Sequence, residues 1–375
     1  MNALRVAIIG TGMIAEVHAR AVRMVGGRLT GVLGSRPERG AQAAQRWGGR
    51  GYLDLEELLA DVPDVVHVCT PNATHAPYVR ALLAAGVAVV CEKPLGLDGA
   101  EAHELADLAR RAGVVATVPF VYRYHPLVRE IRSRVARGGL GRVLLMHGTY
   151  LQDWMLDAHT ANWRVDPALG GGSRAFADIG SHWCDLVEFV SGERFEAASA
   201  QFSLAHPERP IGSDHAFGGG VATAERPIAP VETEDAAIVA LRTRSGVPAS
   251  VVVSQVSAGR KNRLWFEIDG TSASAVFDQE APETVWFGTT NGASVLRRAE
   301  AEPSPEQARL NAFPAGHAQG WGDAFAAFVA DTYAAVRGEA PDGLPTFDDG
   351  ARAADIVDAV RASALSASWE AVAAS

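Results

Sequence analysis

A glycine-rich turn directly after an apolar strand is the feature that most constrains how this chain folds. Residues 4–9 have the composition of a buried strand, the letters GTGMIA follow, and helical spacing continues over residues 18–25. Gly10 permits the tight turn, Gly12 lets the backbone approach a pyrophosphate, and Ala15 lets the helix pack closely on the strand. The N-terminus of that helix supplies N–H groups and a partial positive charge. The stretch therefore predicts a dinucleotide-binding strand, turn and helix.

Strand-like and helix-like segments alternate after this turn, up to about residue 118. Such alternation predicts a parallel sheet with helices on its faces, which is the α/β class. With 375 residues, 48% of them hydrophobic, the chain is long for a single core and favours two domains. Expected strands cover residues 28–33, 51–52, 64–69, 87–91 and 114–118, and expected helices cover residues 37–47, 54–60, a segment ending at 85, and 98–111.

Composition excludes several classes of protein. Acidic residues outnumber basic ones by 44 to 34, so the net charge of −10 argues against a surface for nucleic acid or anionic membranes. The three cysteines are widely spaced within apolar segments, which predicts neither disulfides nor a metal site. No apolar run reaches the ~20 residues of a membrane span, and no leader pattern opens the chain. We expect a cytoplasmic enzyme without a metal.

Ser35 and Arg36 follow the second expected strand, where a dinucleotide-binding domain often carries an acidic reader of the ribose 2′-hydroxyl. A hydroxyl and a guanidinium suit a 2′-phosphate instead, which predicts NADP(H) in preference to NAD(H). The alternative is that Arg36 stacks on the adenine or points into solvent.

Lys93 ends the expected strand at residues 87–91, in the sequence Cys91-Glu92-Lys93-Pro94. Ligands of open α/β sheets bind beyond the carboxyl ends of the strands, so this lysine is predicted to face cofactor and substrate. The alternative is an ordinary ion pair at a strand exit. Thr70, Asn72 and His75 follow the neighbouring strand; they either contact the cofactor or belong to a helix start with a solvated histidine. The residues predicted to bind the dinucleotide are Gly10, Gly12, Met13, Ile14, Ser35, Arg36, Thr70, Asn72, His75, Glu92 and Lys93.

A second group of ionisable residues follows the glycines at 170–172. Asp178, His182 and Asp185 stand at i, i+4 and i+7, so a helix would present all three on one face. A histidine flanked by carboxylates is held in one tautomer with raised basicity, as a general base requires. Taken alone, an aspartate and a histidine one turn apart are more often a surface pair.

The rest of the chain predicts an antiparallel sheet, because hairpin signals recur from residue 195 onward. Residues 205–232 are rich in proline and glycine without periodicity, which predicts a floppy insertion or a lid. One sheet face, such as alternate residues of 251–256, lacks helices to cover it. We therefore expect a homodimer or homotetramer.

The motifs GTGMIA, TPNATH and CEKP, in this order and spacing, resemble the amino-terminal half of the glucose–fructose oxidoreductase, inositol dehydrogenase and rhizopine-catabolism (Gfo/Idh/MocA) family. The letters FVYRYHP resemble the crossover of that family into its second domain. The resemblance implies a Rossmann domain over residues 1–122 and an α+β domain with an open, mainly antiparallel sheet over residues 123–375, whose C-terminal helices can pack back on the first. It also places Lys93 beside the nicotinamide, and the pattern DxGxHxxD matches the family's second signature, in which Asp178 and His182 act with Lys93.

The sequence departs from the family at Arg174, where a glycine is commoner. This arginine is expected to add a cation near the site and puts the usual substrate contacts in doubt. The resemblance nevertheless implies an NAD(P)-dependent oxidoreductase acting on a secondary alcohol or ketone of a sugar, glycoside or cyclitol. The rivals are a non-catalytic dinucleotide sensor, which would not need the three catalytic residues, and a dehydrogenase of a sugar acid or phosphate, which further arginines keep open. The candidate substrate residues are Arg123, Trp163, Asp185 and His317.

Overall fold

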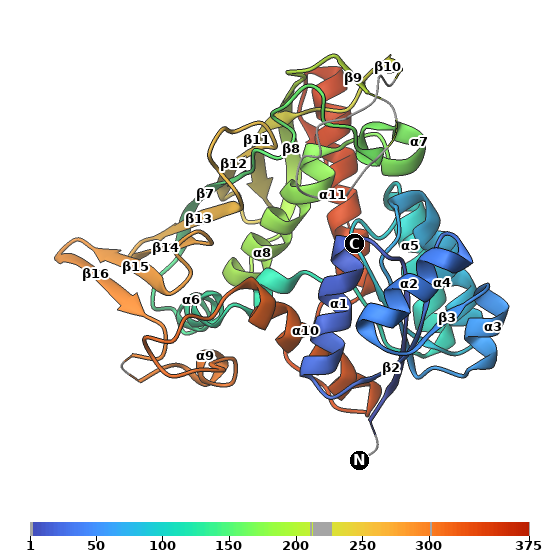
Figure 1. The fold of residues 1–375 in the computed structure, drawn as a ribbon. Helices are drawn as coiled ribbons and strands as arrows, with labels where there is room; N and C mark the ends of the chain where they lie inside the picture. The colour runs from blue at the N-terminus through green and yellow to red at the C-terminus, as the bar shows by residue number, and fades with distance from the viewer. Residues whose placement is uncertain (1–2, 211, 213–226, 301, 375) are drawn as a thin grey trace.

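A six-stranded parallel sheet forms the first half of the fold, which Figure 1 shows in blue to cyan. Its strands have the order β3-β2-β1-β4-β5-β6. The computed structural model describes residues 3–210, 212, 227–300 and 302–374. Every residue of β4 and β5 is buried, as expected for strands covered on both faces. The strands are β1 (Arg5–Ile9), β2 (Arg28–Leu33), β3 (Arg50–Tyr52), β4 (Val65–Val68), β5 (Ala88–Cys91) and β6 (Ala116–Thr117).

Helices cover both faces of this sheet. One face packs on α4 and α5, for example through Val79 and Leu105, and the other packs on α1 through Val22. These elements lie close to the predicted ranges, and the predicted α/β class is confirmed. The helices are α1 (Met13–Met24), α2 (Pro37–Trp47), α3 (Leu55–Ala60), α4 (His75–Ala84) and α5 (Gly99–Ala112), with a 3-10 turn, η1 (Asn72–Thr74), before α4.

The order of the strands reverses at β1, which lies between β2 and β4. A reversal of this kind opens a crevice beyond the carboxyl ends of the strands. Gly10 lies there with a φ of 122°, and a Cβ at this position would be 2.4 Å from the carbonyl oxygen of Cys69. Only glycine fits this turn without moving the backbone, which explains the first glycine of the motif.

A nine-stranded sheet forms the second half, in the order β16-β15-β14-β13-β7-β12-β11-β8-β17. β7 and β12 are parallel, and the other neighbouring strands are antiparallel. Burial alternates along β11 and β13, because helices α6, α8 and α11 cover one face only. The mainly antiparallel sheet is as predicted. Its strands are β7 (Val143–Leu151), β8 (Phe195–Ser203), β11 (Ala236–Thr243), β12 (Pro248–Ser254), β13 (Arg263–Gly270), β14 (Ser274–Asp278), β15 (Thr284–Thr289), β16 (Gly292–Arg297) and β17 (Glu370–Ala371).

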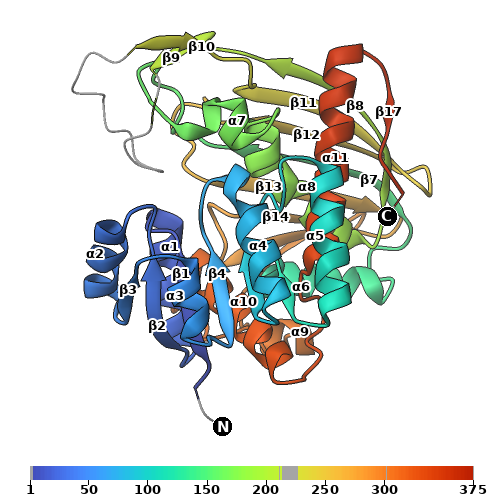
Figure 2. The ribbon, with the colours of Figure 1, turned by 90° about the vertical axis from the view of Figure 1, so that its right-hand side faces the viewer.

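The C-terminal helices return to the first sheet. Phe325 and Phe328 of α10 pack in one cluster with Val22 of α1, and α11 runs beside α5 while also covering the second sheet (Figure 2). None of the helices within the described ranges is long and apolar enough to cross a membrane. The helical segments of this half are η2 (Val121–Tyr124), α6 (Pro126–Ala136), η3 (Trp163–Val165), α7 (Pro167–Gly170), η4 (Phe176–Gly180), α8 (Ser181–Ser191), α9 (Pro305–Ala308), α10 (Trp321–Val336) and α11 (Phe347–Ser366).

Two predictions about organisation meet the structure only in part. The expected domain boundary after residue 122 falls inside η2 and stays a prediction. The ends of the segment 205–232 are regular, since β9 (Glu208–Pro210) and β10 (Ile228–Pro230) pair as antiparallel strands. Residues 211 and 213–226 lie outside the described residues, and so does the expectation of a floppy insertion or lid.

Candidate active site

Lys93 joins the two halves of the molecule. It follows β5, and its Nζ donates to Oδ1 of Asp178 at 2.7 Å and to the Asp178 carbonyl oxygen at 2.8 Å. Asp178 lies in η4, a π-helical turn that leads into α8. The strand-end lysine and the second ionisable group therefore lie together, and their joint catalytic role stays a prediction. The side chains are 13% and 7% exposed, so the ion pair is shielded from bulk water.

The carboxylate of Asp178 is bound on both oxygens. Gln255 donates from Nε2 to Oδ2 at 2.8 Å, and Nε of Arg164 lies 3.6 Å from Oδ1. Burial alone would raise the pKa of this carboxyl, but the charges of Lys93 and Arg164 outweigh burial and hold the pKa well below its usual range. Asp178 is thus an anion at any physiological pH.

His182 opens the first turn of α8 and is enclosed by aromatic rings. Its ring lies edge-on to Phe120 and Tyr122, with centroids 5.6 and 5.2 Å away. Burial lowers the pKa of His182 well below its ordinary value, and the charge of Lys93 lowers it further against the opposing effect of Asp178. The imidazole is therefore neutral at physiological pH and can accept a proton.

The predicted support of His182 by two carboxylates is wrong. Among the described residues nothing hydrogen-bonds to its buried Nδ1 atom. Asp178 turns to Lys93 and Gln255, while Asp185 accepts from Nε of Arg123 at 2.8 Å and from a second guanidinium N–H. The basicity of the histidine is consequently lowered by its surroundings rather than raised.

The candidate substrate residues do not gather in one place. Arg123 and Asp185 are buried together, and Arg123 also donates to Asp349 of α11 at 2.7 Å, so this pair ties η2, α8 and α11 to one another. Trp163 lies under the guanidinium of Arg164, 4.5 Å from its centre, and thus one residue from a group that faces Asp178.

His317 is exposed on the segment before α10. Its carbonyl accepts a hydrogen bond from Arg298, and within the described part of the chain its ring makes no hydrogen bond or ion pair with the catalytic candidates. For all four candidates, contact with substrate stays a prediction.

The dinucleotide side of the site is open at the glycine turn. Gly12 is the N-cap of α1 without a side-chain cap, and Met13 after it is 38% exposed. A Cβ at Gly12 would meet no atom of the described residues within 4 Å. Ser35 and Arg36 are exposed at the end of β2. This arrangement leaves backbone N–H groups of α1 available to a pyrophosphate.

Other predicted cofactor residues are engaged within the protein. His75 is fully buried between the carbonyl oxygens of Thr70 and Pro94, at 2.9 Å from each, so the alternative of a solvated histidine is wrong. Asn72 donates to the carbonyl of Gly170 at 2.8 Å and thereby ties η1 to α7. These residues shape the walls of the crevice.

Arg174 is also placed differently from the expectation. Its guanidinium is fully buried and pairs with Asp235, so it is neutralised within the protein and does not add a free cation to the site. The expectation failed because the partner of Arg174 is Asp235, just after the 205–232 segment. The residues around position 174 give no sign of this partner.

Sequence reasoning missed Gln255 and a buried chain of polar groups under the first sheet. Glu92 accepts from His18 at 2.9 Å, His18 meets His67 at 2.7 Å between Nδ1 atoms, and Nε2 of His67 lies 3.0 Å from the hydroxyl of Tyr333. Two sequence signals could have revealed them. His67 lies inside the apolar strand β4, and Gln255 continues the alternation of buried residues that includes Val251 and Val253 of β12.

Two cavities adjoin the ion pair. One lies between Lys93, the glycines at 170–172 and α11 and holds about 520 Å³ of space, open solvent at its mouth included; the other, of about 200 Å³ on the same measure, lies beside Asn72 and Asp178. Both are therefore next to a group that can stabilise charge.

One group of side chains within the described residues has the composition of a cation site, namely His147 with Glu267 and Asp269. It lies on the uncovered face of the second sheet.

Comparisons with known proteins cover almost the whole chain. Residues 4–120 match the oxidoreductase family with an NAD-binding Rossmann fold, and residues 128–276 match the GFO/IDH/MocA C-terminal domain. Levoglucosan dehydrogenase from Pseudarthrobacter phenanthrenivorans is 32% identical over 98% of both chains. The 1,5-anhydro-D-fructose reductase of Ensifer adhaerens is 30% identical over 79% of this chain and 80% of its own. A levoglucosan dehydrogenase complex with NADH and L-sorbose superposes with a TM-score of 0.89 at 29% identity, covering 99% of each chain.

Proposed function

Because the chain belongs to the Gfo/Idh/MocA family of oxidoreductases, we propose that it transfers a hydride between a nicotinamide dinucleotide and a secondary alcohol or ketone of a sugar, glycoside or cyclitol. The observation that carries the proposal is the meeting of Lys93 and Asp178, from different halves of the molecule, beside His182. Gly10 and Gly12 fit a dinucleotide, since one shapes the turn and the other leaves open space at the start of α1.

The three residues divide the work by charge. A nicotinamide bound in the crevice would supply the hydride acceptor. Lys93 stabilises the negative charge that develops on the substrate oxygen, because its ammonium group is partly shielded from water. Asp178 fixes the direction of that ammonium group through two acceptors. The neutral His182 takes the hydroxyl proton, and loss of a positioned base costs ~10²–10⁴-fold in rate.

Substitution of two residues tests this division. We expect His182→Ala and Lys93→Met each to lower turnover by ~10²–10⁴-fold while leaving dinucleotide binding in place. The chain's other lysine offers a matched control, since Lys261 is 77% exposed, and Lys261→Met is expected to keep wild-type turnover. Wild-type rates in the Lys93 and His182 variants would refute the assignment. A wild-type protein that binds the dinucleotide but oxidises no sugar would favour the sensor.

The substrate proposal is an uncharged sugar or anhydro-sugar. It is supported by the relatives, whose names are those of a levoglucosan dehydrogenase and an anhydrofructose reductase, and by the pairing of Arg174 with Asp235, which removes one cation from the pocket. Oxidation rates with levoglucosan, glucosides, inositols and their phosphorylated or acidic counterparts decide the matter. Activity confined to the charged compounds would overturn it.

For the cofactor we propose NADP(H) in preference to NAD(H). The support is Ser35 and Arg36, exposed at the end of β2 with no acidic residue beside them, and a charged hydrogen bond to phosphate contributes ~1.5–3 kcal/mol. NAD(H) is the alternative, because the related levoglucosan dehydrogenase is bound to NADH. Fluorescence titration with both cofactors tests the preference, and tighter binding of NADH would reverse it.

A homodimer or homotetramer formed through the second sheet completes the proposal. The uncovered face carries large apolar side chains, with Ile238 60%, Val252 39%, Trp286 38% and Val295 66% exposed. A second copy can cover such a face by an isologous contact. Light scattering should return a multiple of the 39.5 kDa monomer, and Ile238→Lys should shift the mass toward the monomer.

We also propose a cytoplasmic location, which the three free, buried cysteines support. Cell fractionation tests it.

A further inference from the structure

Gln255 holds the oxygen of Asp178 that Lys93 leaves free. Its Nε2 donates to Oδ2 at 2.8 Å, whereas Lys93 donates to Oδ1. The glutamine follows β12 in the inward phase of Val251 and Val253, and it is fully buried. Its side chain therefore approaches Asp178 from the sheet, on a rigid element and without competition from water.

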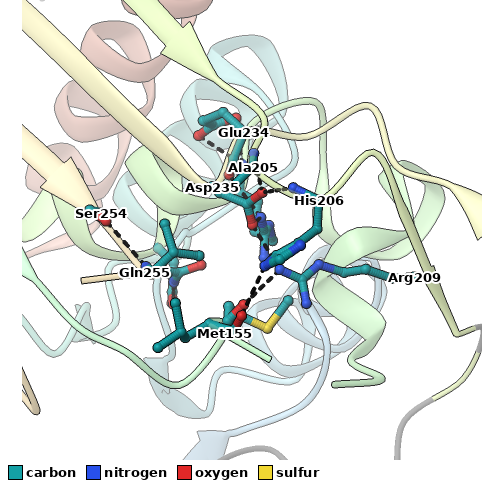
Figure 3. Close-up of polar contacts among 12 residues, drawn as sticks. Met155, Ala205, His206, Arg209, Glu234, Asp235, Ser254 and Gln255 are labelled. Carbon is teal, nitrogen blue, oxygen red and sulfur yellow. Dashed lines mark hydrogen bonds and ion pairs between the residues drawn. The ribbon is translucent and has the colours of Figure 1, made fainter. Parts of the chain in front are cut away.

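The main chain of Gln255 is fixed on both sides. Its N–H donates to the carbonyl of Asp235 at 2.9 Å, and its own carbonyl accepts from the N–H of Met155 at 3.1 Å (Figure 3). The carboxylate of Asp235 is itself fully buried and accepts from the backbone N–H groups of Ala205 and His206 at 2.8 and 3.0 Å. Gln255 is thus attached to the base of the 205–232 segment.

Two arginines complete the surroundings of Asp235. Arg209 donates to Oδ1 at 3.0 Å, and Arg174 donates to the same oxygen. All three side chains are fully buried, so each charge depends on the others for compensation. These ion pairs fix the position of Asp235, whose carbonyl accepts the hydrogen bond from the N–H of Gln255.

Glu234 binds the turn that precedes Asp178, not Asp178 itself. Its carboxylate accepts from the hydroxyl of Ser173 at 2.8 Å, from the N–H of Phe176 at 2.8 Å and from the N–H of Arg174 at 3.1 Å. These donors form the turn immediately before Asp178, where the helical segment begins with unpaired N–H groups. Burial raises the pKa of Glu234, against the effect of those hydrogen bonds.

We propose that Gln255, Glu234 and Asp235 are positioning residues for Asp178, and through it for the ammonium group of Lys93. Gln255 sets the rotation of the carboxylate, and Glu234 and Asp235 set the backbone on either side of the contact. The inference rests on the proposed function, because it assigns these residues to the catalysis of that same site. Without Gln255, the carboxylate of Asp178 loses a fixed partner and the ammonium group loses its defined direction.

Gln255→Met removes the donor and keeps the length of the side chain. Loss of a hydrogen bond to a charged group predicts a fall in kcat of about 10- to 100-fold. KM and the dinucleotide dissociation constant should change by less than about 3-fold, because Gln255 is fully buried and acts through Asp178. Ser254→Ala is the matched control: Ser254 is the buried neighbour, its hydroxyl accepts from Val256, and kcat should be unchanged.

Gln255→Glu gives a signature that a purely structural role does not. The groups that face Asp178 are Lys93 after β5, Arg164 in η3, His182 in α8 and residue 255 itself. At low pH the new carboxyl is protonated and can donate to Asp178; at high pH it is an anion and repels Asp178. We expect kcat of this variant to fall as pH rises through the pKa of the new group, a limb that wild type lacks. A structural defect would lower kcat equally at every pH.

Asp178→Asn, measured in parallel, separates the two proposals. Wild-type turnover in Asp178→Asn would refute the proposed function. Slow turnover in Asp178→Asn together with wild-type kcat in Gln255→Met, or with a pH-independent defect in Gln255→Glu, would refute the positioning role alone. If Gln255→Met does not fold, as judged by circular dichroism, the pH profile of Gln255→Glu decides the question by itself.

Discussion

Replacing His67 with leucine is a direct test of the polar chain beneath the first sheet. Nδ1 of His67 lies 2.7 Å from His18 and Nε2 lies 3.0 Å from the hydroxyl of Tyr333. Burial lowers the pKa of His67 well below its ordinary value, so this ring is neutral. One arrangement of hydrogen bonds satisfies every group of the chain: Tyr333 donates to His67, His67 to His18, and His18 to Glu92.

The magnitude follows from the groups left behind. Leucine makes neither hydrogen bond, so Nδ1 of His18 and the hydroxyl of Tyr333 become buried without partners, at a cost of ~1–3 kcal/mol each. Better burial of the leucine side chain offsets ~1–2 kcal/mol of this loss. We expect the free energy of unfolding to fall by about 1–4 kcal/mol. Urea unfolding followed by circular dichroism measures it.

A double-mutant cycle with Tyr333→Phe isolates the bond. Once His67 is leucine, removing the hydroxyl should cost little or restore stability, so the two changes should couple by at least ~1 kcal/mol. Tyr78→Phe serves as the control and should leave stability unchanged, because the Tyr78 hydroxyl makes no hydrogen bond within the described part of the chain. Two outcomes would show that the hydrogen-bonded chain does not contribute to stability. One is a His67→Leu variant as stable as wild type, and the other is a double variant whose loss equals the sum of the two single losses within ~0.5 kcal/mol.

Three further predictions follow from other contacts. Gly10→Ala places a Cβ 2.4 Å from the Cys69 carbonyl oxygen and should lower the free energy of unfolding, measured in urea, by more than ~2 kcal/mol. In Gly12→Ala the Cβ meets no atom of the described residues within 4 Å, so this variant should weaken only dinucleotide binding, measured by fluorescence titration. Asp235→Asn leaves two buried guanidinium groups undercompensated and should cost ~3–5 kcal/mol in the same unfolding assay. The lowered pKa of Asp178 gives stability that is present above the unfolded pKa of ~3.9 and is lost as pH falls toward the folded value. The stability difference from Asp178→Asn should therefore be constant from pH ~8 to ~5 and shrink below ~4.

The sequence was sufficient for the fold because its strongest signals are local. The glycine turn at residue 10 and the alternation of strands and helices depend on neighbours in the chain, and the structure reproduces both. The meeting of Lys93 with Asp178 came from the resemblance of their motifs to one family. Lys93 and Asp178 are 85 residues apart in the chain, so local spacing alone gives no reason to place them in contact.

The details of the site depended on longer-range or irregular features. Residues Phe176–Gly180 form a π-helical turn, and an extra residue in a turn rotates the following side chains by about 100° relative to a regular helix. The i, i+4, i+7 spacing assumes a regular helix through Asp178, whereas the regular helix begins only at Ser181. Arg174 was misjudged because its partner, Asp235, lies 61 residues further along the chain. A pattern read within one segment does not contain such partners.

The return of α10 to the first sheet has a consequence for how the chain is made. Phe325, Phe328 and Val329 share a core with Val6 of β1 and Val90 of β5, so one face of the first sheet is completed by residues near the end of the chain. Domains generally fold in order as they leave the ribosome. Helix α1 also packs on this face through Val22, but the part of the face that α10 covers stays exposed until α10 has been translated. Synthesis of nearly the whole polypeptide must precede the completion of its first domain.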